Sequence, residues 1–343
     1  MLSFFRWVLF FIVLFATLIG GTLFIGHEML VAQGPLETTK RIVIPRGAGP
    51  TAMAKVLHDE NVIAYPRLFR VALIVDPSPK PIKAGEYEVP AHASMRAVVD
   101  LLQSGKVVQR RLTIPEGMTT AEAIELVRKT EALSGDITLD LKEGDLLPET
   151  YFYSRDDTRD SVLLRAKEAM DKTLDEAWRK RAAGLPLANR REALVLASIV
   201  EKETAVAAER ARVSAVFVNR LRRKMRLESD PTTIYGLTKG KGPLGRELTR
   251  ADLQSTSPYN TYFVVGLPPT PICNPGRASI LAALNPQARE RAIYFVADGQ
   301  GGHAFANTLV EHNQNVARWR EIQRQRQEQG QGQPPATPVP GRR

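Results

Sequence analysis

The chain has 343 residues, of which 43% are hydrophobic and 24% are charged, and these values are ordinary for a folded globular protein. Its 47 Lys and Arg against 37 Asp and Glu give a formal net charge of +10, which favours anionic partners, but no helix-turn-helix or zinc-finger signature supports nucleic acid as one of them. The single cysteine excludes a framework of intrachain disulfides, and the five histidines lack the spacing of metal ligands, so no metal and no cofactor are predicted.

An uncharged apolar run of twenty residues, 7–26, lies close to the N-terminus. As a helix, at about 1.5 Å per residue, it is long enough to cross a hydrocarbon core of about 30 Å. We therefore predict a transmembrane helix over residues 7–26, with a short segment, 1–6, before it and a linker, 27–39, after it. A cleaved signal peptide is the alternative, although the apolar region of such a peptide usually spans only about 7–15 residues.

A strand-turn-helix pattern recurs after the linker, with copies that begin near Arg41, Tyr87 and Arg111. Each copy has a short β-type run ended by Pro, then a turn, a Ser or Thr in a capping position and an amphipathic helix. This pattern predicts small modules of one strand and one helix.

The most informative stretch is a predicted helix from Asn189 to Thr204. Asn189 and Glu192 have the spacing of a capping box, which marks a helix start. Glu203 then continues an apolar helical face, whereas Glu201 lies about 200° around the helix and should point elsewhere. The residues of this face are Leu196, Ile199, Val200 and Glu203.

Glu203 is the candidate general acid because of this predicted burial. A carboxyl group against apolar side chains has its charged form disfavoured by desolvation, so its pKa rises and it can hold a proton near neutral pH. The alternative is an amphipathic Glu at a helix end that reaches solvent or pairs with a basic side chain.

Other helices are predicted over residues 161–180 and 208–224. Asn219 and Arg220 lie on the second of these, and we expect them to brace the fold.

Asp230 and Pro231 are predicted to begin a turn, because the residue before Pro avoids the helical region. A loop rich in rigid and hydrogen-bonding groups follows, and it contains Tyr259, Asn260 and Tyr262. Such loops commonly carry binding residues, and the alternative is a Pro-rich connector without a ligand.

Residues 292–297 and 302–305 are predicted to form a hairpin around Asp298 and Gly299. His303 on the returning strand is either a polar group near the acid or a residue that ties down the hairpin. A last helix follows, and the Gln-, Gly- and Pro-rich tail, 325–343, is predicted to be disordered.

Four segments of this sequence, in the same order, resemble the motif series of the MltG/YceG family. This family comprises endolytic murein transglycosylases, which are anchored in the inner membrane and cut the glycan strands of bacterial peptidoglycan. The resemblance extends from the membrane segment to about Arg320, and the family's catalytic acid, the second Glu of its EKET motif, corresponds to Glu203. Where the family carries a Pro-Asp-Thr-Trp or similar stretch, this chain has Glu149 in place of Asp. The segments are ASIVEKETAVAAERARVSAVFVNRL, SDPTTIYGL, SPYNTYFVVGLPPTPICNPG and YFVADGQGGHAF.

The resemblance implies an α+β protein with a LysM-like domain over residues 40–110 and a catalytic domain over 111–324. It places the N-terminus in the cytoplasm and the catalytic body in the periplasm, on a single-pass anchor in the inner membrane. The implied partners are peptidoglycan glycan strands, the membrane and peptidoglycan synthases. A spacer without glycan contact is an equal alternative for residues 40–110. The implied sugar contacts are Tyr259, Asn260 and Tyr262, with Asp230 and His303 as further candidates.

The implied reaction is a lytic cleavage linked to cell-wall elongation. Glu203 protonates the oxygen of the MurNAc-β-1,4-GlcNAc bond, and the C6 hydroxyl of the same MurNAc then closes a 1,6-anhydro ring. Two alternatives stay open at this point: a lysozyme-type hydrolase that uses Glu203 with Asp230 or another acid, and a non-catalytic, membrane-tethered scaffold that binds peptidoglycan.

Overall fold

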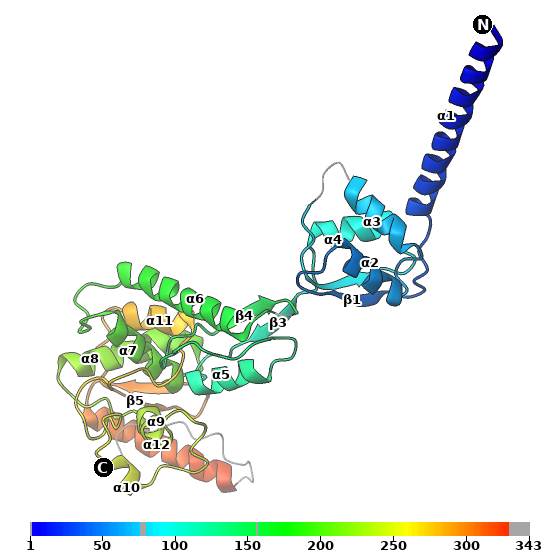
Figure 1. Ribbon diagram of the computed structural model, residues 1–343. Helices are drawn as coiled ribbons and strands as arrows, with labels where there is room; N and C mark the ends of the chain where they lie inside the picture. Colours follow the sequence, from blue (N-terminus) through cyan, green and yellow to red (C-terminus); the bar gives the residue numbers. More distant parts are fainter. Residues whose placement is uncertain (1, 76–79, 156, 329–343) are drawn as a thin grey trace. The chain divides into compact units, whose positions relative to one another are not determined.

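The computed structural model describes residues 2–75, 80–155 and 157–328, and these residues form a mixture of helices and short strands, as predicted (Figure 1). They fall into two compact units. Unit 1 comprises Met1–Arg110 and Phe152–Asp157, and unit 2 comprises Arg111–Tyr151 and Thr158–Arg343.

Unit 1 begins with the long apolar helix α1 (Leu2–Val31), which includes the predicted membrane span and continues into the predicted linker. Within the described part of the chain, α1 alone is long and apolar enough to cross a membrane, over Phe4–Val31 with a mean hydropathy of 2.7. Its apolar side chains are mostly exposed.

The rest of unit 1 is a two-stranded antiparallel sheet covered by helices. Strand β1 (Lys40–Ile44) pairs with β2 (Gly85–Val89), in a register that sets Lys40 opposite Val89 and Ile44 opposite Gly85. Ile42 and Ile44 face a core that the helices complete. These helices are α2 (Pro50–Asp59), α3 (Pro66–Val75) and α4 (Met95–Ser104).

The recurring modules form with strand and helix in the predicted order: β1 and α2, β2 and α4, and β3 (Arg110–Thr113) and α5 (Thr120–Lys129). The predicted Ser or Thr cap is wrong for the first copy, because α2 begins at Pro50 after Gly49, without a side-chain cap. Ser94 caps α4 by accepting a hydrogen bond from the Ala97 amide, and Thr119 and Glu122 form a complete capping box on α5. Each cap satisfies amides that the first helical turn leaves unpaired, so the module boundaries follow from local chemistry.

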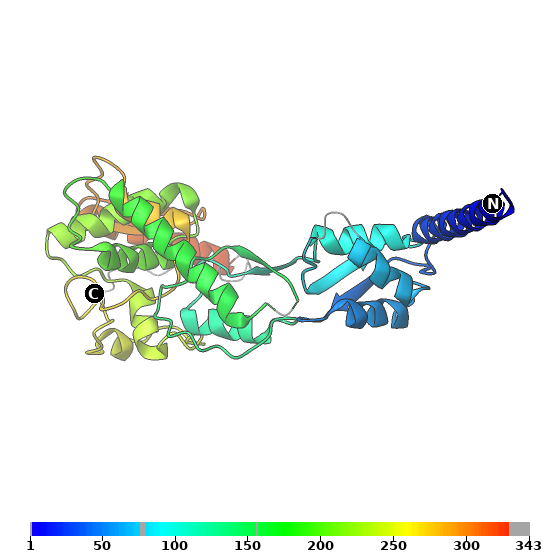
Figure 2. The ribbon, with the colours of Figure 1, turned by 45° about the horizontal axis from the view of Figure 1, so that its top comes forward.

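Unit 2 is built around α7 (Arg190–Glu203), which packs against α6 (Arg159–Arg179), α8 (Arg210–Arg222) and α11 (Arg277–Leu284) (Figures 1 and 2). Residues 193–200 of α7 are all buried, so this helix is covered on every side through its middle turns. Asn189 caps it by accepting a hydrogen bond from the Glu192 amide, as predicted.

The remaining elements of unit 2 cover this helical core. The hairpin of β5 (Tyr294–Ala297) and β6 (His303–Ala306) forms where predicted, and α12 (Leu309–Glu328) packs on it through Trp319. The predicted disorder of the tail is wrong for residues 325–328, which continue α12, while 329–343 lie outside the described residues. The other elements of unit 2 are the short 3-10 helix η1 (Ala207–Glu209), α9 (Asp230–Thr238) and α10 (Arg250–Leu253). Strand β4 (Thr150–Tyr153), which has residues in both units, pairs with β3.

Asp230 and Pro231 begin the helix α9 and not the predicted isolated turn. Proline is compatible with a helix start, because the amide that it lacks has no partner in the first helical turn. The same dipeptide therefore suits both structures, and the tertiary context selects the helix.

Candidate active site

Glu203 is the last residue of α7, and its side chain is buried, with 3% of the residue exposed, as its helical spacing predicts. Glu201, two residues earlier, points elsewhere. Its Oε2 accepts a hydrogen bond from the Gly276 amide at 2.9 Å, and its Oε1 lies 3.6 Å from Nη2 of Arg210. One carboxyl group of this helix end is therefore paired, and the other enters the core.

The Glu203 carboxyl group has one hydrogen bond, from the Ser229 hydroxyl to Oε1 at 2.5 Å. Its second oxygen, Oε2, is buried without a hydrogen-bond partner among the residues that the structure describes. Burial raises the pKa of Glu203 to about 8, and the negative charge of Asp230 contributes in the same direction. The Ser229 hydrogen bond and the positive charge of Arg220 oppose this rise in pKa but do not cancel it.

Two helix ends meet at this carboxyl group. Glu203 ends α7, where the partial negative charge of the helix dipole disfavours an anion, while Ser229 immediately precedes α9. Ser229 occupies the N-cap position of α9, but its side chain forms no capping hydrogen bond and donates to Glu203 instead. The hydroxyl of a serine in an N-cap position thus forms a hydrogen bond with a buried carboxyl group in place of a helix cap.

The segment that carries Ser229 is fixed to the loop at Thr261. The Glu228 amide donates to the Thr261 carbonyl at 3.1 Å, and the Ser229 amide donates to Oγ1 of Thr261 at 3.0 Å. The next residues on the two segments are also joined, because the Tyr262 hydroxyl donates to Oδ1 of Asp230 at 2.7 Å. The structure therefore brings Asp230 and Tyr262 together beside the hydrogen bond between Ser229 and Glu203.

The other two residues predicted on this loop are engaged by the protein itself. Asn260 is fully buried, and its side-chain amide donates to the carbonyls of Leu253 and Ser255 at 2.9 and 2.7 Å. The Tyr259 hydroxyl lies 2.8 Å from Oγ1 of Thr270. These contacts give Asn260 and Tyr259 a clear part in shaping the loop.

His303 lies on β6 and connects the hairpin to η1. Its Nδ1 is 2.7 Å from Oε2 of Glu209, and its backbone amide donates to Oε1 of the same residue at 2.9 Å. Its ring packs edge-on against Phe295 and against Phe305. In the part of the chain that the structure describes, His303 has no hydrogen bond to Glu203.

Arg220 holds the segment before Ser229 through hydrogen bonds to Leu227 and Glu228, in line with its predicted structural role. It is 1% exposed, and its guanidinium donates to the carbonyls of Ile293 and Leu227 at 2.6 and 3.0 Å and to Oε2 of Glu228 at 3.1 Å. Asn219 beside it also ties α8 to the chain before β5, through the carbonyl oxygens of residues 290 and 292. The position of the Ser229 hydroxyl therefore depends on α8.

Ser229 is a site residue that was not selected from the sequence, although it opens the segment SDPTTIYGL that resembles a motif of the family. A serine directly before Asp-Pro reads as an ordinary N-cap, since serine is a preferred residue at that position. Only the packing of α9 against the end of α7 shows that its hydroxyl is directed to Glu203.

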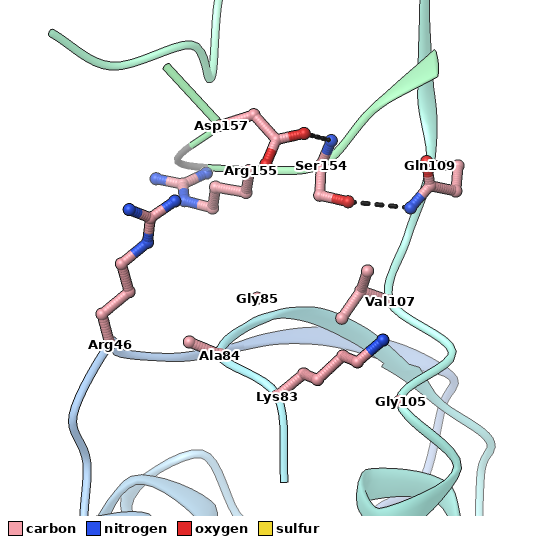
Figure 3. A pocket seen from close by; sticks show the side chains of 10 residues that line it. All are labelled: Arg46, Lys83, Ala84, Gly85, Gly105, Val107, Gln109, Ser154, Arg155 and Asp157. Atoms are coloured by element: carbon pink, nitrogen blue, oxygen red, sulfur yellow. Dashed lines mark hydrogen bonds between the residues drawn. The ribbon is translucent and has the colours of Figure 1, made fainter. Parts of the chain in front are cut away.

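Two cavities lie away from Glu203. One, of about 280 Å³, is in unit 1, where Arg46 and Arg155 lie on the side of Asp157 and Lys83 lies on the opposite side, near Val107 (Figure 3). The other, of about 440 Å³, lies in unit 2 at the opposite end of α7, next to Asn189. Across the described ranges, no cluster of three or more His, Cys, Asp or Glu could hold a metal ion.

Comparisons with known proteins converge on one family. Residues 42–318 match the YceG-like family. A curated relative, the endolytic murein transglycosylase of Bacillus subtilis, is 28% identical over 87% of this chain and 89% of its own. The endolytic murein transglycosylase of Streptococcus pneumoniae is also 28% identical, over 90% of this chain and 64% of its own. Among solved structures, a yceG-like protein of Listeria monocytogenes is 29% identical and has a TM-score of 0.50, over 80% of this chain and 98% of that protein.

Proposed function

Because the chain belongs to the YceG-like family, we propose that it is a lytic transglycosylase that cleaves MurNAc-β-1,4-GlcNAc bonds of peptidoglycan, with Glu203 as its catalytic acid. The names of the relatives in B. subtilis and S. pneumoniae support this reaction and its endolytic character. The single observation that carries the proposal is the buried Glu203 carboxyl group, whose pKa is raised to about 8. A carboxylic acid of this kind holds its proton at neutral pH, as a general acid must.

In the first half of the reaction, protonated Glu203 donates its proton to the glycosidic oxygen. The bond between that oxygen and C1 of MurNAc breaks, GlcNAc leaves as an alcohol, and positive charge develops on the MurNAc ring. Glu203 becomes an anion in this step. The Ser229 hydroxyl, which already donates to Oε1, then stabilises that anion through a charge-assisted hydrogen bond.

In the second half, the Glu203 carboxylate takes the proton of the C6 hydroxyl while O6 bonds to C1. The product is a 1,6-anhydro ring, Glu203 recovers its proton, and no water is consumed. Attack by a group of the same sugar has the entropic advantage of an intramolecular reaction. A second carboxylate is not required as a nucleophile or as a base.

Asp230 and Tyr262 are the residues that we assign to substrate contact. Their side chains are joined at 2.7 Å, and the charge of Asp230 acts on Glu203, so a sugar that reaches the acid also comes near this pair. A negative charge there favours the positive charge that develops on the sugar ring. Asn260 is fully buried, and the ring of His303 is held by Glu209 instead of lying at Glu203, which supports structural roles for both.

The test is mass spectrometry of the muropeptides that the purified protein releases from peptidoglycan, with Glu203→Gln measured alongside. We expect 1,6-anhydro ends from the wild type and a rate about 10²- to 10⁴-fold lower from the variant, which is the usual contribution of general acid-base catalysis. Reducing MurNAc ends would identify a hydrolase that uses Asp230 or another acid. Unchanged release by Glu203→Gln would exclude Glu203 as the acid, and no release by a folded wild type would favour the non-catalytic scaffold.

We also propose that α1 anchors the protein in the inner membrane, with units 1 and 2 on the periplasmic side. The length and composition of α1 support the anchor, and the substrate of the relatives supports the location. The link to cell-wall elongation and to peptidoglycan synthases rests on the family resemblance. For residues 40–110, glycan contact by a LysM-like domain and a spacer role remain the two candidates.

A further inference from the structure

Helix α3 of unit 1 exposes apolar side chains that the rest of the unit leaves uncovered. Val71, Ile74 and Val75 are 53%, 76% and 72% exposed. The opposite side of α3 is packed, since Phe69 is fully buried in the core of unit 1. We call the three exposed residues the α3 apolar tip. Single exposed apolar side chains are common on soluble proteins, but three within the C-terminal half of one short helix indicate a surface with a partner.

The exposed charges of α3 are of one sign. The helix carries Arg67 and Arg70, both exposed, and has no acidic residue. Tyr65, directly before the helix, is 52% exposed. A helix with basic and aromatic groups in and before its N-terminal half, and bare aliphatic side chains in its C-terminal half, fits the boundary between lipid headgroups and acyl chains. There the long basic side chains reach the phosphates while the aliphatic groups leave water.

The position of α3 within unit 1 identifies the surface that it meets. Helices α1 and α3 both pack against α4 (Figure 1). Leu30, next to the end of α1, packs on the core of unit 1. The chain after α1 is then held by hydrogen bonds from the Gly34 amide to the His92 carbonyl at 3.3 Å and from the His92 amide to the Leu36 carbonyl at 2.7 Å. Little free chain therefore separates the apolar helix from unit 1, and a bilayer crossed by α1 must begin close to α4 and its neighbours.

We propose that α3 lies in the surface of the bilayer that α1 enters, with the α3 apolar tip between the lipids and Arg67 and Arg70 at the phosphates. This inference rests on the membrane-anchor part of the proposed function. It makes unit 1 a membrane-seated body, attached at two points, in place of a domain that swings freely on a single helix. A second copy of the chain is the competing occupant of the tip.

Depth-dependent quenching in vesicles tests this contact on the full chain. Ile74→Cys carries an environment-sensitive fluorophore, and the vesicles contain phosphatidylglycerol and lipids with a nitroxide high on the acyl chain. The native Cys273 is fully buried, so it stays unlabelled. Val265→Cys in unit 2, where the native side chain is 59% exposed, is the matched control. We expect severalfold stronger quenching at position 74 than at position 265, and a loss of most of that difference in Arg67→Glu/Arg70→Glu.

A third label, at Leu14→Cys within α1, separates the possible failures. Quenching at position 14 without quenching at position 74 would overturn the α3 contact and leave the anchor intact. No quenching at position 14 would overturn the anchor, and the inference with it, while the peptidoglycan cleavage test still decides the enzyme. Excimer formation between pyrene labels at position 74, without lipid quenching, would assign the tip to a second copy and overturn the membrane contact.

Discussion

The chemistry of Glu203 depends on opposing influences from its neighbours. Burial and the charge of Asp230 keep the proton on the carboxyl group, while Ser229 and Arg220 lower the free energy of the anion. Both forms are needed in a lytic reaction, because the same group first gives a proton and then takes one. A pKa of about 8 keeps the acid protonated at neutral pH and still leaves the anion within reach.

The pH dependence of the reaction follows from this pKa. Only protonated Glu203 can act as the acid, so the rate of anhydro-muropeptide release should stay high below about pH 8 and fall about tenfold per pH unit above it. Initial rates between pH 6 and pH 10, with folding followed by circular dichroism, measure this limb. A rate that rises through pH 8 would contradict an acid with this pKa.

Ser229→Ala should move the alkaline limb to higher pH. The hydroxyl stabilises the carboxylate and thus lowers the pKa of Glu203, so its removal raises that pKa. A hydrogen bond to a charged group contributes about 1.5 kcal/mol or more, which corresponds to about one pH unit. Ser279→Ala is the control, because Ser279 is equally buried and its hydroxyl has no hydrogen-bond partner within the described residues. If the fall in rate occurs at the same pH in Ser229→Ala as in the wild type, the serine does not influence the pKa of Glu203.

Asp230→Asn should shift the same limb in the opposite direction. The negative charge of Asp230 raises the pKa of Glu203, and the neutral amide removes that effect, so the limb should move below pH 8. We also expect at least about a tenfold lower rate at the pH optimum, because the proposed role of Asp230 is to favour the positive charge that develops on the sugar. Tyr262→Phe, which keeps the charge of Asp230 and removes only its hydrogen-bond partner, should leave the limb near pH 8. If the rate of Asp230→Asn falls at the same pH as that of the wild type, the charge of Asp230 does not affect the pKa of Glu203.

The residues of the candidate site differ in how far local patterns reveal them. Glu203 could be selected because its burial is a periodic property of one helix. Ser229 could not, because its partner is 26 residues away in sequence and its local context predicts an N-cap. Asn260 was predicted to bind substrate from the composition of its loop, yet its side-chain amide donates to carbonyls of that same loop. Contacts between segments that are distant in the sequence could thus not be predicted from local patterns.

At the scale of elements, α8 supports the site through one buried side chain. Arg220 is almost fully enclosed, and it satisfies the carbonyl oxygens of Ile293 and Leu227. Arg220→Met should lower the free energy of unfolding by about 3–5 kcal/mol, because it leaves those carbonyls and the Glu228 carboxylate without their partner. Urea denaturation measures the loss. Arg222→Met on the same helix is the control, since Arg222 is exposed and, among the described residues, its guanidinium donates only to the Gly184 carbonyl. An equal loss in both variants would contradict the role of Arg220.

Elements with local caps were the most predictable. In the three strand-helix modules and in α7, a Ser, Thr, Asn or Pro near the helix start predicts where the helix begins. Side-chain caps form at Ser94, Thr119 and Asn189. The start of α9 was predicted wrongly, because Asp-Pro is equally compatible with a turn. Its helical outcome depends on Thr261 and on the end of α7, which lie far from it in sequence.

At the scale of the whole molecule, α1 should determine where the protein is found. The full chain should remain with membranes after alkaline carbonate washing and leave them only with detergent, because the mostly apolar 28-residue span Phe4–Val31 is, as a helix, longer than the hydrocarbon core is thick. A variant that lacks residues 2–31 should appear in the soluble fraction. Release of the full chain by carbonate, or processing at a site near residue 31 that removes α1, would contradict the anchor.

Unit 1 is discontinuous along the chain, and this has a consequence for how the protein is made. Its last segment, Phe152–Asp157, follows residues 111–151 of unit 2, and it contributes the Ser154 hydroxyl that accepts a hydrogen bond from the Gln109 side chain at 2.7 Å. A growing chain leaves the ribosome from its N-terminus. Unit 1 therefore stays incomplete while the first part of unit 2 is synthesised, and translation that stops anywhere before residue 157 yields an unfinished unit 1.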